Sequence, residues 1–574
     1  MVQVFHFIKS FFAELFIIFL LILCINNYIG NVDQTIKADG IGYYDYLPSV
    51  FIHHDLDRRS FDQKLSPEEF ERIKSLGVYV NYKGSMVNKY TCGTALLDSP
   101  FFLATYFFQN KSESPNNGYQ ASYQHAILYA ALFYLFLALF FFKKILQLYK
   151  CSYSTILLSQ LLIVFATSVT NYANFDASYS HINSLFAISA FIYFTKLYFE
   201  NRKFSTYYLA CAMLGLIIIL RPVNGMIIFF IPFLAGSFRK LKEEFIFLLS
   251  HFLKTFAGIL LIAVILSIQC LLWYFQTGSM LIYTYGNEGF NFLNPEVSNV
   301  LFSYRKGLFV YTPVLLLTMA ALIWLGIKRK FYELFTWLGF FVLITYVISS
   351  WWCWFYGGSY GLRAYVDFYT IFFILFALMF DKLAAWLKIL FIIPAIIFAY
   401  INVIQTYQYK EFILHWGDMD KAKYWTVFLK TGEPYKGMVW KRQYDYMQYQ
   451  KIEELAFGDF TIPAHKDSTI ALIHSSNLEN AVLFQVGISN DFREDNDGGI
   501  LLLIKEIKSD SVVFWHQRYL QHFNEKGLNQ YNTGLFNYEL PAKLSDKDYE
   551  LKIVTHSASK SLDLKNVKLT VFKK

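Results

Sequence analysis

The sequence of 574 residues has few cysteines and few charges, and each shortage excludes a class of protein. Only 6 cysteines occur; they lie far apart, and four of them stand inside apolar runs. Because there is no Cys-x-x-Cys pair and no cysteine–histidine cluster, neither a zinc site nor a disulfide framework is indicated. Charged residues make up 16% of the chain, and the net charge of +8 does not indicate nucleic acid, since the basic loops of membrane proteins produce the same excess.

The sequence is instead rich in long apolar runs. Hydrophobic residues make up 55% of the chain and aromatic residues 20%. Many runs reach about 18 residues, enough to cross a hydrocarbon core of roughly 30 Å. We therefore predict a polytopic α-helical membrane protein with about eleven spans, at residues 11–29, 121–142, 153–170, 182–199, 205–221, 223–238, 251–275, 308–326, 332–350, 366–381 and 384–404. The run 95–108 is too short to cross and is predicted to be a re-entrant or surface helix.

The basic residues between these runs predict the orientation of the spans. They occur in alternate connections, at Lys9, Lys143–Lys144, Arg202–Lys203, Arg239–Lys242, Lys328–Lys330 and Lys382. Cytoplasmic loops carry an excess of lysine and arginine, so we predict a multi-pass protein with a cytoplasmic N-terminus and an extracytoplasmic C-terminal part. The first run is longer than the core of a signal peptide and lacks a small-residue cleavage site, which predicts a retained helix.

The pattern changes near the end of the last apolar run. We predict a membrane domain at 1–404 with a large first outer loop at 30–120, a helical linker at 405–449, and a β domain at 450–574. In this last part, short alternating runs such as 468–473 and 481–486 are separated by turn residues. Short strands at regular spacing are typical of an all-β sandwich.

An acidic residue opens the first outer loop, in the segment ADGIGYYDYLP at residues 38–48. Asp-Gly is a common turn dipeptide, so Asp39 is either a turn residue or a general base at the membrane boundary. Tyr43 and Tyr44 of the same segment are candidates for substrate contact. The other two acidic residues, Asp45 and Asp55, are predicted to be solvated.

Three more polar residues stand beside predicted spans on the same side. Lys89 precedes the run 95–108; such a lysine is usually solvated, but here it opposes the positive-inside bias, as a cation that binds a lipid phosphate would. Asp176 and His181 stand at the entry to the fourth span. An acidic residue suits a helix start as a cap, and the histidine can be an interfacial side chain. Both are also candidates for catalysis.

Arginines recur on this side of the membrane. Arg221 closes the fifth span, Arg305 precedes the eighth, and Arg363 ends the segment WWCWFYGGSYGLR at residues 351–363. Tryptophans at an interface normally form an aromatic belt, but a belt does not require three glycines followed by an arginine. Each arginine can hold a phosphate with its planar fork of N–H donors.

The aromatic and glycine residues of this segment suit a sugar. Rings such as that of Trp354 can stack on a sugar face, and a glycine such as Gly358 lets a ligand approach the backbone closely. We therefore predict that Trp354 and Gly358 contact the substrate.

Taken in order, these motifs resemble those of bacterial polytopic glycosyltransferases of the GT-C superfamily, which include relatives of protein O-mannosyltransferases and of the lipid A aminoarabinose transferase. The matching motifs are DGxGYYxYLP, NKYxxGxALLxxPFF, SH at the fourth span, RPxN, SxRxGLFxYxP and WxxGGxxGxR. The resemblance covers roughly residues 1–405 and leaves the C-terminal β domain outside.

The resemblance implies a hexosyl- or pentosyltransferase of the bacterial inner membrane. Such an enzyme moves a sugar from a polyprenyl-phosphate carrier to a protein, lipid or glycan acceptor of the cell envelope, with inversion at the anomeric carbon. The implied catalytic residues are Asp39, Asp176 and His181, and the implied phosphate ligands are Lys89, Arg221, Arg305 and Arg363. No cofactor is certain, and a divalent metal is possible.

Two other classes remain open. A polysaccharide polymerase or ligase is also polytopic with outer catalytic loops, although an acidic first loop and a β domain are less expected there. A transporter would place charges or broken helices at mid-membrane and often has two similar halves. Charges are scarce within the predicted spans and polar residues gather on one side, which favours an enzyme.

Overall fold

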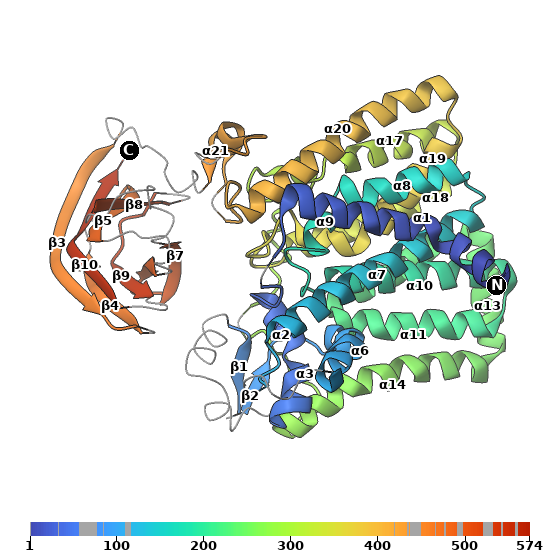
Figure 1. Ribbon diagram of the computed structural model, residues 1–574, viewed down its shortest axis with the longest axis horizontal. Helices are drawn as coiled ribbons and strands as arrows, with labels where there is room; N and C mark the ends of the chain where they lie inside the picture. Colours follow the sequence, from blue (N-terminus) through green and yellow to red (C-terminus); the bar gives the residue numbers. More distant parts are fainter. Residues whose placement is uncertain are drawn as a thin grey trace. The chain divides into compact units, whose positions relative to one another are not determined.

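The computed structural model describes residues 2–32, 34–56, 77–83, 85–108, 116–286, 288–417, 419–432, 435–436, 449–464, 466–475, 478–490, 498–519, 532–540, 543–556 and 561–573. The chain divides into two compact units, Met1–Thr431 and Gly432–Lys574. The first is mostly helical and the second is built of strands (Figure 1). The predicted fold class, a polytopic helical protein with a C-terminal β domain, is confirmed.

Helices of very different lengths make up the first unit. The longer ones are α1 (Val2–Cys24), α6 (Gly93–Phe108), α7 (Ala121–Leu148), α8 (Tyr153–Phe165), α10 (His181–Asn201), α11 (Phe204–Leu220), α13 (Phe238–Ser250), α14 (Phe252–Thr277), α17 (Val314–Ile327), α18 (Phe331–Ser349), α19 (Tyr369–Asp381) and α20 (Ala385–Lys410). The shorter ones are η1 (Ile25–Ile29), α2 (Asp39–Tyr44), α3 (Tyr46–Pro48), η2 (Ser49–His53), α9 (Val169–Tyr172), η3 (Pro222–Phe230), α12 (Ile231–Ala235), α15 (Val297–Phe302), α16 (Leu308–Tyr311), η4 (Arg363–Phe368) and α21 (Lys421–Val427).

The apolar helices account for the predicted spans in three ways. Within the residues described, seven helices are long and apolar enough to cross a membrane, or eight when the bent pair 222–235 and 238–250 counts as one span. Three other predicted spans coincide with the shorter apolar helices α8, α11 and α17. Several apolar helices of this length indicate a multi-pass membrane protein.

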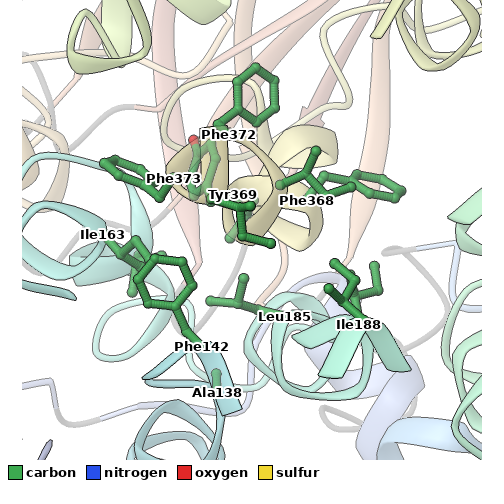
Figure 2. Close-up of a cluster of buried hydrophobic side chains, with 14 of the residues drawn as sticks. Ala138, Phe142, Ile163, Leu185, Ile188, Phe368, Tyr369, Phe372 and Phe373 are labelled. Atoms are coloured by element: carbon green, nitrogen blue, oxygen red, sulfur yellow. The ribbon is translucent and has the colours of Figure 1, made fainter. Parts of the chain in front are cut away.

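The core of this unit lies where α7, α8, α10 and α19 meet. Ala138 and Phe142 of α7 lie near Leu185 of α10, and the aromatic side chains at 368–373 lie opposite (Figure 2). All of these side chains are buried. The same cluster extends to α17, α18 and α20, so the helices share one apolar core.

A buried ion pair and a hydrogen bond join α1, α7 and α8, and they correct the predicted position of Lys143. Lys143, predicted to lie in a basic loop, is a buried residue of α7, which continues to Leu148. Its Nζ lies 2.5 Å from Oε2 of Glu14 in α1, and Gln160 of α8 donates a hydrogen bond to Glu14 Oε1 at 2.7 Å. Because a buried charge without its partner is costly, this cluster favours one arrangement of α1, α7 and α8.

The first loop is ordered by a buried carboxylate. Asp45 and Asp55, predicted to be solvated, are both buried, and that prediction was wrong. Tyr119 donates its hydroxyl to Asp45 Oδ1 at 2.5 Å, and Tyr79 donates to Oδ2. Tyr79 belongs to the hairpin of β1 (Tyr79–Tyr82) and β2 (Ser85–Asn88). Asp45 therefore joins α2 and α3 to segments that are distant in the sequence.

The second unit contains two antiparallel sheets. One has the strand order β3-β10-β5-β8 and the other β4-β9-β6-β7. The strands are β3 (Gln450–Ile462), β4 (Asp467–Ser475), β5 (Ala481–Asn490), β6 (Gly499–Glu506), β7 (Ser511–Tyr519), β8 (Asn532–Glu539), β9 (Tyr549–His556) and β10 (Leu562–Lys573). Side chains of both sheets, such as Phe484 and Leu502, share one buried cluster, as alternating strands require.

The structure describes only part of the predicted linker at residues 405–449. Helix α20 extends to Lys410, beyond the predicted end of the membrane domain at residue 404, and α21 follows. The boundary between the two compact units falls at Thr431, inside the predicted linker 405–449. Residues 437–448 of that linker lie outside the described part of the chain.

Candidate functional site

Asp39 begins a short helix instead of occupying a turn. Ala38 before it has φ of 47°, and the chain then enters α2 with Asp39 as its first residue. A side chain on Gly40 would overlap with Ser178, because α2 packs closely against the segment that precedes α10. Glycine at position 40 therefore permits this packing and places the Asp39 carboxylate at the end of α10 and α11.

An ion pair holds the Asp39 carboxylate. Arg363 Nη2 lies 2.6 Å from Asp39 Oδ2, and the carboxylate side chain remains 28% exposed. Burial raises the pKa of Asp39, but the charge of Arg363 and a hydrogen bond from Tyr90 outweigh it, so the pKa lies below its usual value. Asp39 is therefore ionised at neutral pH and partly open to solvent.

Several charged groups lie near Asp39 and the neighbouring Tyr43. The charges of Arg221, Asp39 and Arg363 all act on the hydroxyl of Tyr43, and that of Lys89 acts on Asp39. The Tyr43 ring packs on the Tyr90 ring with centroids 4.5 Å apart. Tyr43 thus lies among the charged residues and is 8% exposed, and its contact with substrate stays a prediction.

A second carboxylate, not predicted from the sequence, organises Arg221. Asp367 in η4 accepts a hydrogen bond from Arg221 Nη1 at 2.7 Å and one from Asn224 Nδ2 at 2.7 Å. Its other oxygen lies 2.7 Å from Nδ1 of His181, which is 3.2 Å from Arg221 Nη1. His181 and Arg221 therefore belong to one buried network centred on Asp367.

The other two predicted phosphate ligands, Lys89 and Arg305, have partners other than Asp39 and Asp367. Lys89 Nζ lies 2.5 Å from Oε1 of Glu288, in the loop that follows α14. The guanidinium of Arg305 stacks on the ring of Phe355, 3.4 Å from its centroid. Lys89, Arg221 and Arg363 thus each have a carboxylate partner in this structure.

Lys306 organises the glycine-containing loop before Arg363. It is buried, and its Nζ donates to the carbonyl of Gly357 at 3.0 Å and to the hydroxyl of Ser359 at 2.5 Å. Burial and the charges of Arg363 and Arg305 hold the pKa of Lys306 well below its usual value. Gly357 and Gly361 have φ of 61° and 60°, a conformation that favours glycine. Lys306 therefore stabilises the loop at residues 357–362, which directly precedes Arg363.

Asp176 lies beside this group and faces a different cation. Its Oδ1 is 3.7 Å from Nζ of Lys37, and Asn171 donates a hydrogen bond to Oδ2 at 2.7 Å. Burial is the largest influence on Asp176 and raises its pKa, against the opposing charge of Lys37. It does not cap α10, whose N-cap residue is Ser180.

The remaining predicted substrate contacts differ in their surroundings. Tyr44 is 1% exposed and donates its hydroxyl to the carbonyl of Gly118 at 2.5 Å, so it is a core residue of the first loop and not a substrate contact. Trp354 packs against the edge of the helical core. Gly358 is partly exposed, its carbonyl accepts a hydrogen bond from Tyr179, and a side chain there would meet nothing within 4 Å. A Cβ atom at position 358 would therefore meet open space.

The elements bring these residues to one end of the helices. Asp39 begins α2, His181 begins α10, Arg221 follows α11, and Arg363 begins η4. Within the described residues no group of three or more His, Cys, Asp or Glu side chains could hold a metal ion.

Sequence reasoning missed Asp367, Lys306 and Glu288 as members of the site. Asp367 had a usable signal, because an ionisable residue inside an apolar run is usually functional or paired. Lys306 stood next to Arg305 in a recognised motif, but its burial depends on the fold. Glu288 had no local signal, since its contact with Lys89 joins two separate loops.

Comparisons with known proteins include a similarity to a solved structure. No protein-family model matches the chain, and no curated protein matches it. The structure is similar to the crystal structure of the Archaeoglobus fulgidus oligosaccharyltransferase in the apo form, with a TM-score of 0.40 and 11% sequence identity. The match covers 76% of this chain and 60% of that one, so the chain spans less than two thirds of the length of that protein.

Proposed function

We propose that this protein is a membrane glycosyltransferase that moves a sugar from a polyprenyl-phosphate carrier to an acceptor hydroxyl or amine. The observation that carries the proposal is the ionised, partly exposed Asp39 among Arg363, Arg221 and Lys89. A carboxylate can take a proton from an acceptor, and cations can stabilise a phosphate that leaves with negative charge. The order of the sequence motifs supports the same function.

The chemical step can be written with the residues of this site. The acceptor oxygen or nitrogen attacks the anomeric carbon while its proton passes to Asp39. The bond between the anomeric carbon and the phosphate oxygen breaks, and the carrier phosphate leaves with that electron pair. Attack from the side opposite the phosphate inverts the anomeric carbon.

The arginines can contact a phosphate without losing their carboxylate partners. A guanidinium has five N–H donors, and Arg363 uses its Nη2 group for Asp39. In the same way Asp367 and His181 contact Nη1 of Arg221 and orient it. His181 and Asp367 then position Arg221, while Lys306 positions the loop of Arg363.

Asp39 is the better candidate for the base than Asp176. The Asp39 side chain is 28% exposed, whereas that of Asp176 is 3% exposed and held by Lys37 and Asn171. An acceptor can reach only a carboxylate that is open to it. We assign Asp176 to the support of the segment before α10.

The donor class is the first test of this function. Purified protein should turn over a polyprenyl-phosphate sugar and not a nucleotide sugar, because the clustered cations suit a phosphate and no cytoplasmic loop contains a Gly-rich phosphate loop or an Asp-x-Asp motif. Sugar release is measured with each donor type in detergent or in vesicles. Turnover of a nucleotide sugar without lipid carrier contradicts the proposal, and repeated addition to one growing chain indicates a polysaccharide polymerase instead.

We further propose that the site opens on the extracytoplasmic face of the membrane. The basic connections, including Lys203 and Lys330, are at the opposite ends of the spans from Asp39 in the predicted topology, and basic residues favour the cytoplasm. A reporter that is active only after export should be active when fused after residue 450 and silent when fused near Lys330. The reverse pattern at either position contradicts this orientation.

A further inference from the structure

Helix α13 lies across the end of the helices opposite to the candidate site. The site is at the first residue of α10, His181, and α13 contacts the residue that follows α10, Arg202. A helix of 21 residues is about 30 Å long, close to the thickness of a hydrocarbon core. The chain turns by 118° between the segment 222–235 and α13, so α13 runs closer to perpendicular than parallel to the preceding helix. It is therefore placed along the opposite membrane interface.

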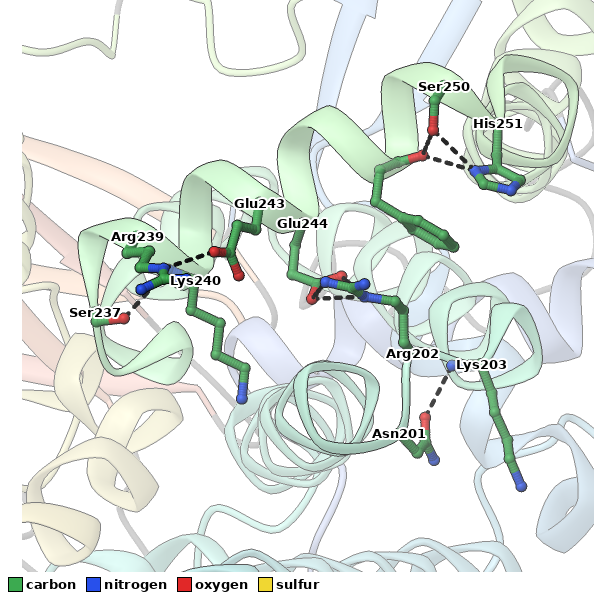
Figure 3. A network of polar contacts seen from close by, with 11 residues as sticks. Asn201, Arg202, Lys203, Ser237, Arg239, Lys240, Glu243, Glu244, Ser250 and His251 are labelled. Carbon is green, nitrogen blue, oxygen red and sulfur yellow. Dashed lines mark hydrogen bonds and ion pairs between the residues drawn. The ribbon is translucent and has the colours of Figure 1, made fainter.

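One side of α13 is fixed to the protein. The buried Glu244 accepts hydrogen bonds from Nε of Arg202 at 2.9 Å and from Nη2 at 2.6 Å (Figure 3). The Arg202 guanidinium also lies 4.9 Å from the ring of Phe247, which packs on Phe204 at the start of α11. This side has its partners within the chain.

The other side of α13 is apolar and exposed. Phe238, Phe245 and Leu249 are 68%, 63% and 58% exposed. The exposed surface continues onto Phe252 and Leu253 in the first turn of α14, a helix with few buried residues. Since α14 is a candidate membrane span, the apolar side of α13 is continuous with a surface that faces lipid.

Cations border this apolar side, and the acidic residues of α13 do not neutralise them. Glu243 pairs with Arg239 at 2.8 Å and Glu244 with Arg202, which leaves Lys242 and Lys254 without a carboxylate partner among the described residues. Both lysines are exposed. Lys242 is three residues before Phe245, on the same helix face, so its chain can follow the apolar surface and place its charge at phosphate level.

We propose that α13 and the start of α14 form a binding surface for the headgroups of anionic phospholipids. The exposed phenylalanine and leucine side chains enter the bilayer boundary, and Lys242 and Lys254 contact lipid phosphates beside them. A lipid with net negative charge fits better than a zwitterionic one, because the two lysines have no neutralising carboxylate.

Lipid binding to the full-length protein tests this surface directly. Native mass spectrometry of the detergent-solubilised chain would follow added phosphatidylglycerol and phosphatidylcholine with the same acyl chains. Each lysine near an anionic headgroup contributes about a fivefold gain in affinity, so Lys242→Gln with Lys254→Gln should weaken phosphatidylglycerol binding about 25-fold. Phosphatidylcholine binding should not change.

The matched control replaces two exposed lysines of the β unit. Lys508→Gln with Lys543→Gln removes the same charge away from the membrane helices and should change phosphatidylglycerol binding by less than about twofold. Equal phosphatidylglycerol binding by wild type and the Lys242/Lys254 variant overturns the proposal, as does phosphatidylcholine binding as tight as phosphatidylglycerol binding. Full displacement by inorganic phosphate would identify a simple anion site and also overturns it.

A charge-conserving variant separates binding from folding. If the glutamine variant aggregates, Lys242→Arg with Lys254→Arg should bind phosphatidylglycerol as the wild type does. Loss of binding in a folded arginine variant contradicts the proposal.

Discussion

Asparagine in place of Asp39 is expected to reduce sugar transfer by about 10²- to 10⁴-fold, the usual contribution of a general base. Asparagine has nearly the same size and can still accept a hydrogen bond from Arg363, but it cannot take the proton of the acceptor. The rate is measured with saturating donor and acceptor in purified protein. Donor binding should persist, because the cations of the site are unchanged.

Two control variants show whether the loss belongs to Asp39. Asp510→Asn removes an exposed carboxylate of the β unit, whose side chain is 85% exposed, and should leave the rate unchanged. Asp176→Asn tests a buried carboxylate beside the site. If Asp39→Asn keeps more than about a tenth of the activity while Asp176→Asn abolishes it, the base is Asp176 and our assignment is wrong.

Glutamine in place of Arg363 is expected to lower donor use by about 10- to 100-fold, because a charge-assisted hydrogen bond contributes roughly 1.5–3 kcal/mol. The same change should alter the pH profile. Burial raises the pKa of Asp39 and Arg363 opposes it, so removing the cation raises that pKa. The base works only when it is unprotonated, and the acid limb of kcat/KM should therefore move to higher pH in Arg363→Gln.

Arg305→Gln is the matched comparison for this pH effect. Arg305 stacks on Phe355 and does not act as the ion-pair partner of Asp39. Its removal should weaken donor use in the same way but leave the acid limb where it is in the wild type. An acid limb that stays unchanged in Arg363→Gln, or that moves equally in both variants, contradicts the role of the Asp39–Arg363 pair.

Asp367 belongs to the candidate site because it contacts Arg221, although the two residues are far apart in the sequence. Asp367 contacts Arg221 and Asn224, which lie at the junction of α11 and η3, and His181, which begins α10. Asp367, His181 and Asn224 are buried, so their hydrogen bonds are made away from competing water, while the Arg221 side chain is 14% exposed. The resemblance implies a catalytic role for His181, and we propose from these contacts that His181 positions Arg221.

Local patterns in the sequence predicted the elements well. Apolar length predicted the membrane helices, and alternation over residues 450–574 predicted the strands of two packed sheets, because both features depend on which faces of a helix or strand meet an apolar surface. The sequence also predicted that Asp39, Arg221 and Arg363 lie beside helix ends, and the structure places them there.

Local patterns failed where burial depends on contacts between distant segments. Asp45 and Tyr44 looked like solvent- and substrate-facing residues, yet hydrogen bonds to Tyr119 and to Gly118 hold them in the core of the first loop. Lys143 looked like a loop residue but pairs with Glu14 inside the helices. In each case the partner is remote in the sequence, so no pattern along the chain records it.

The sequence by itself therefore determined the class of this protein: apolar helices, a β unit and polar motifs beside the helix ends. Only the tertiary structure decided which charges meet, namely Asp39 with Arg363, Asp367 with Arg221, and Glu288 with Lys89. The physical reason is the distance along the sequence between the residues that interact. Helix and strand periodicity arise from neighbouring residues, whereas an ion pair forms only after packing has brought two distant segments within a few ångströms.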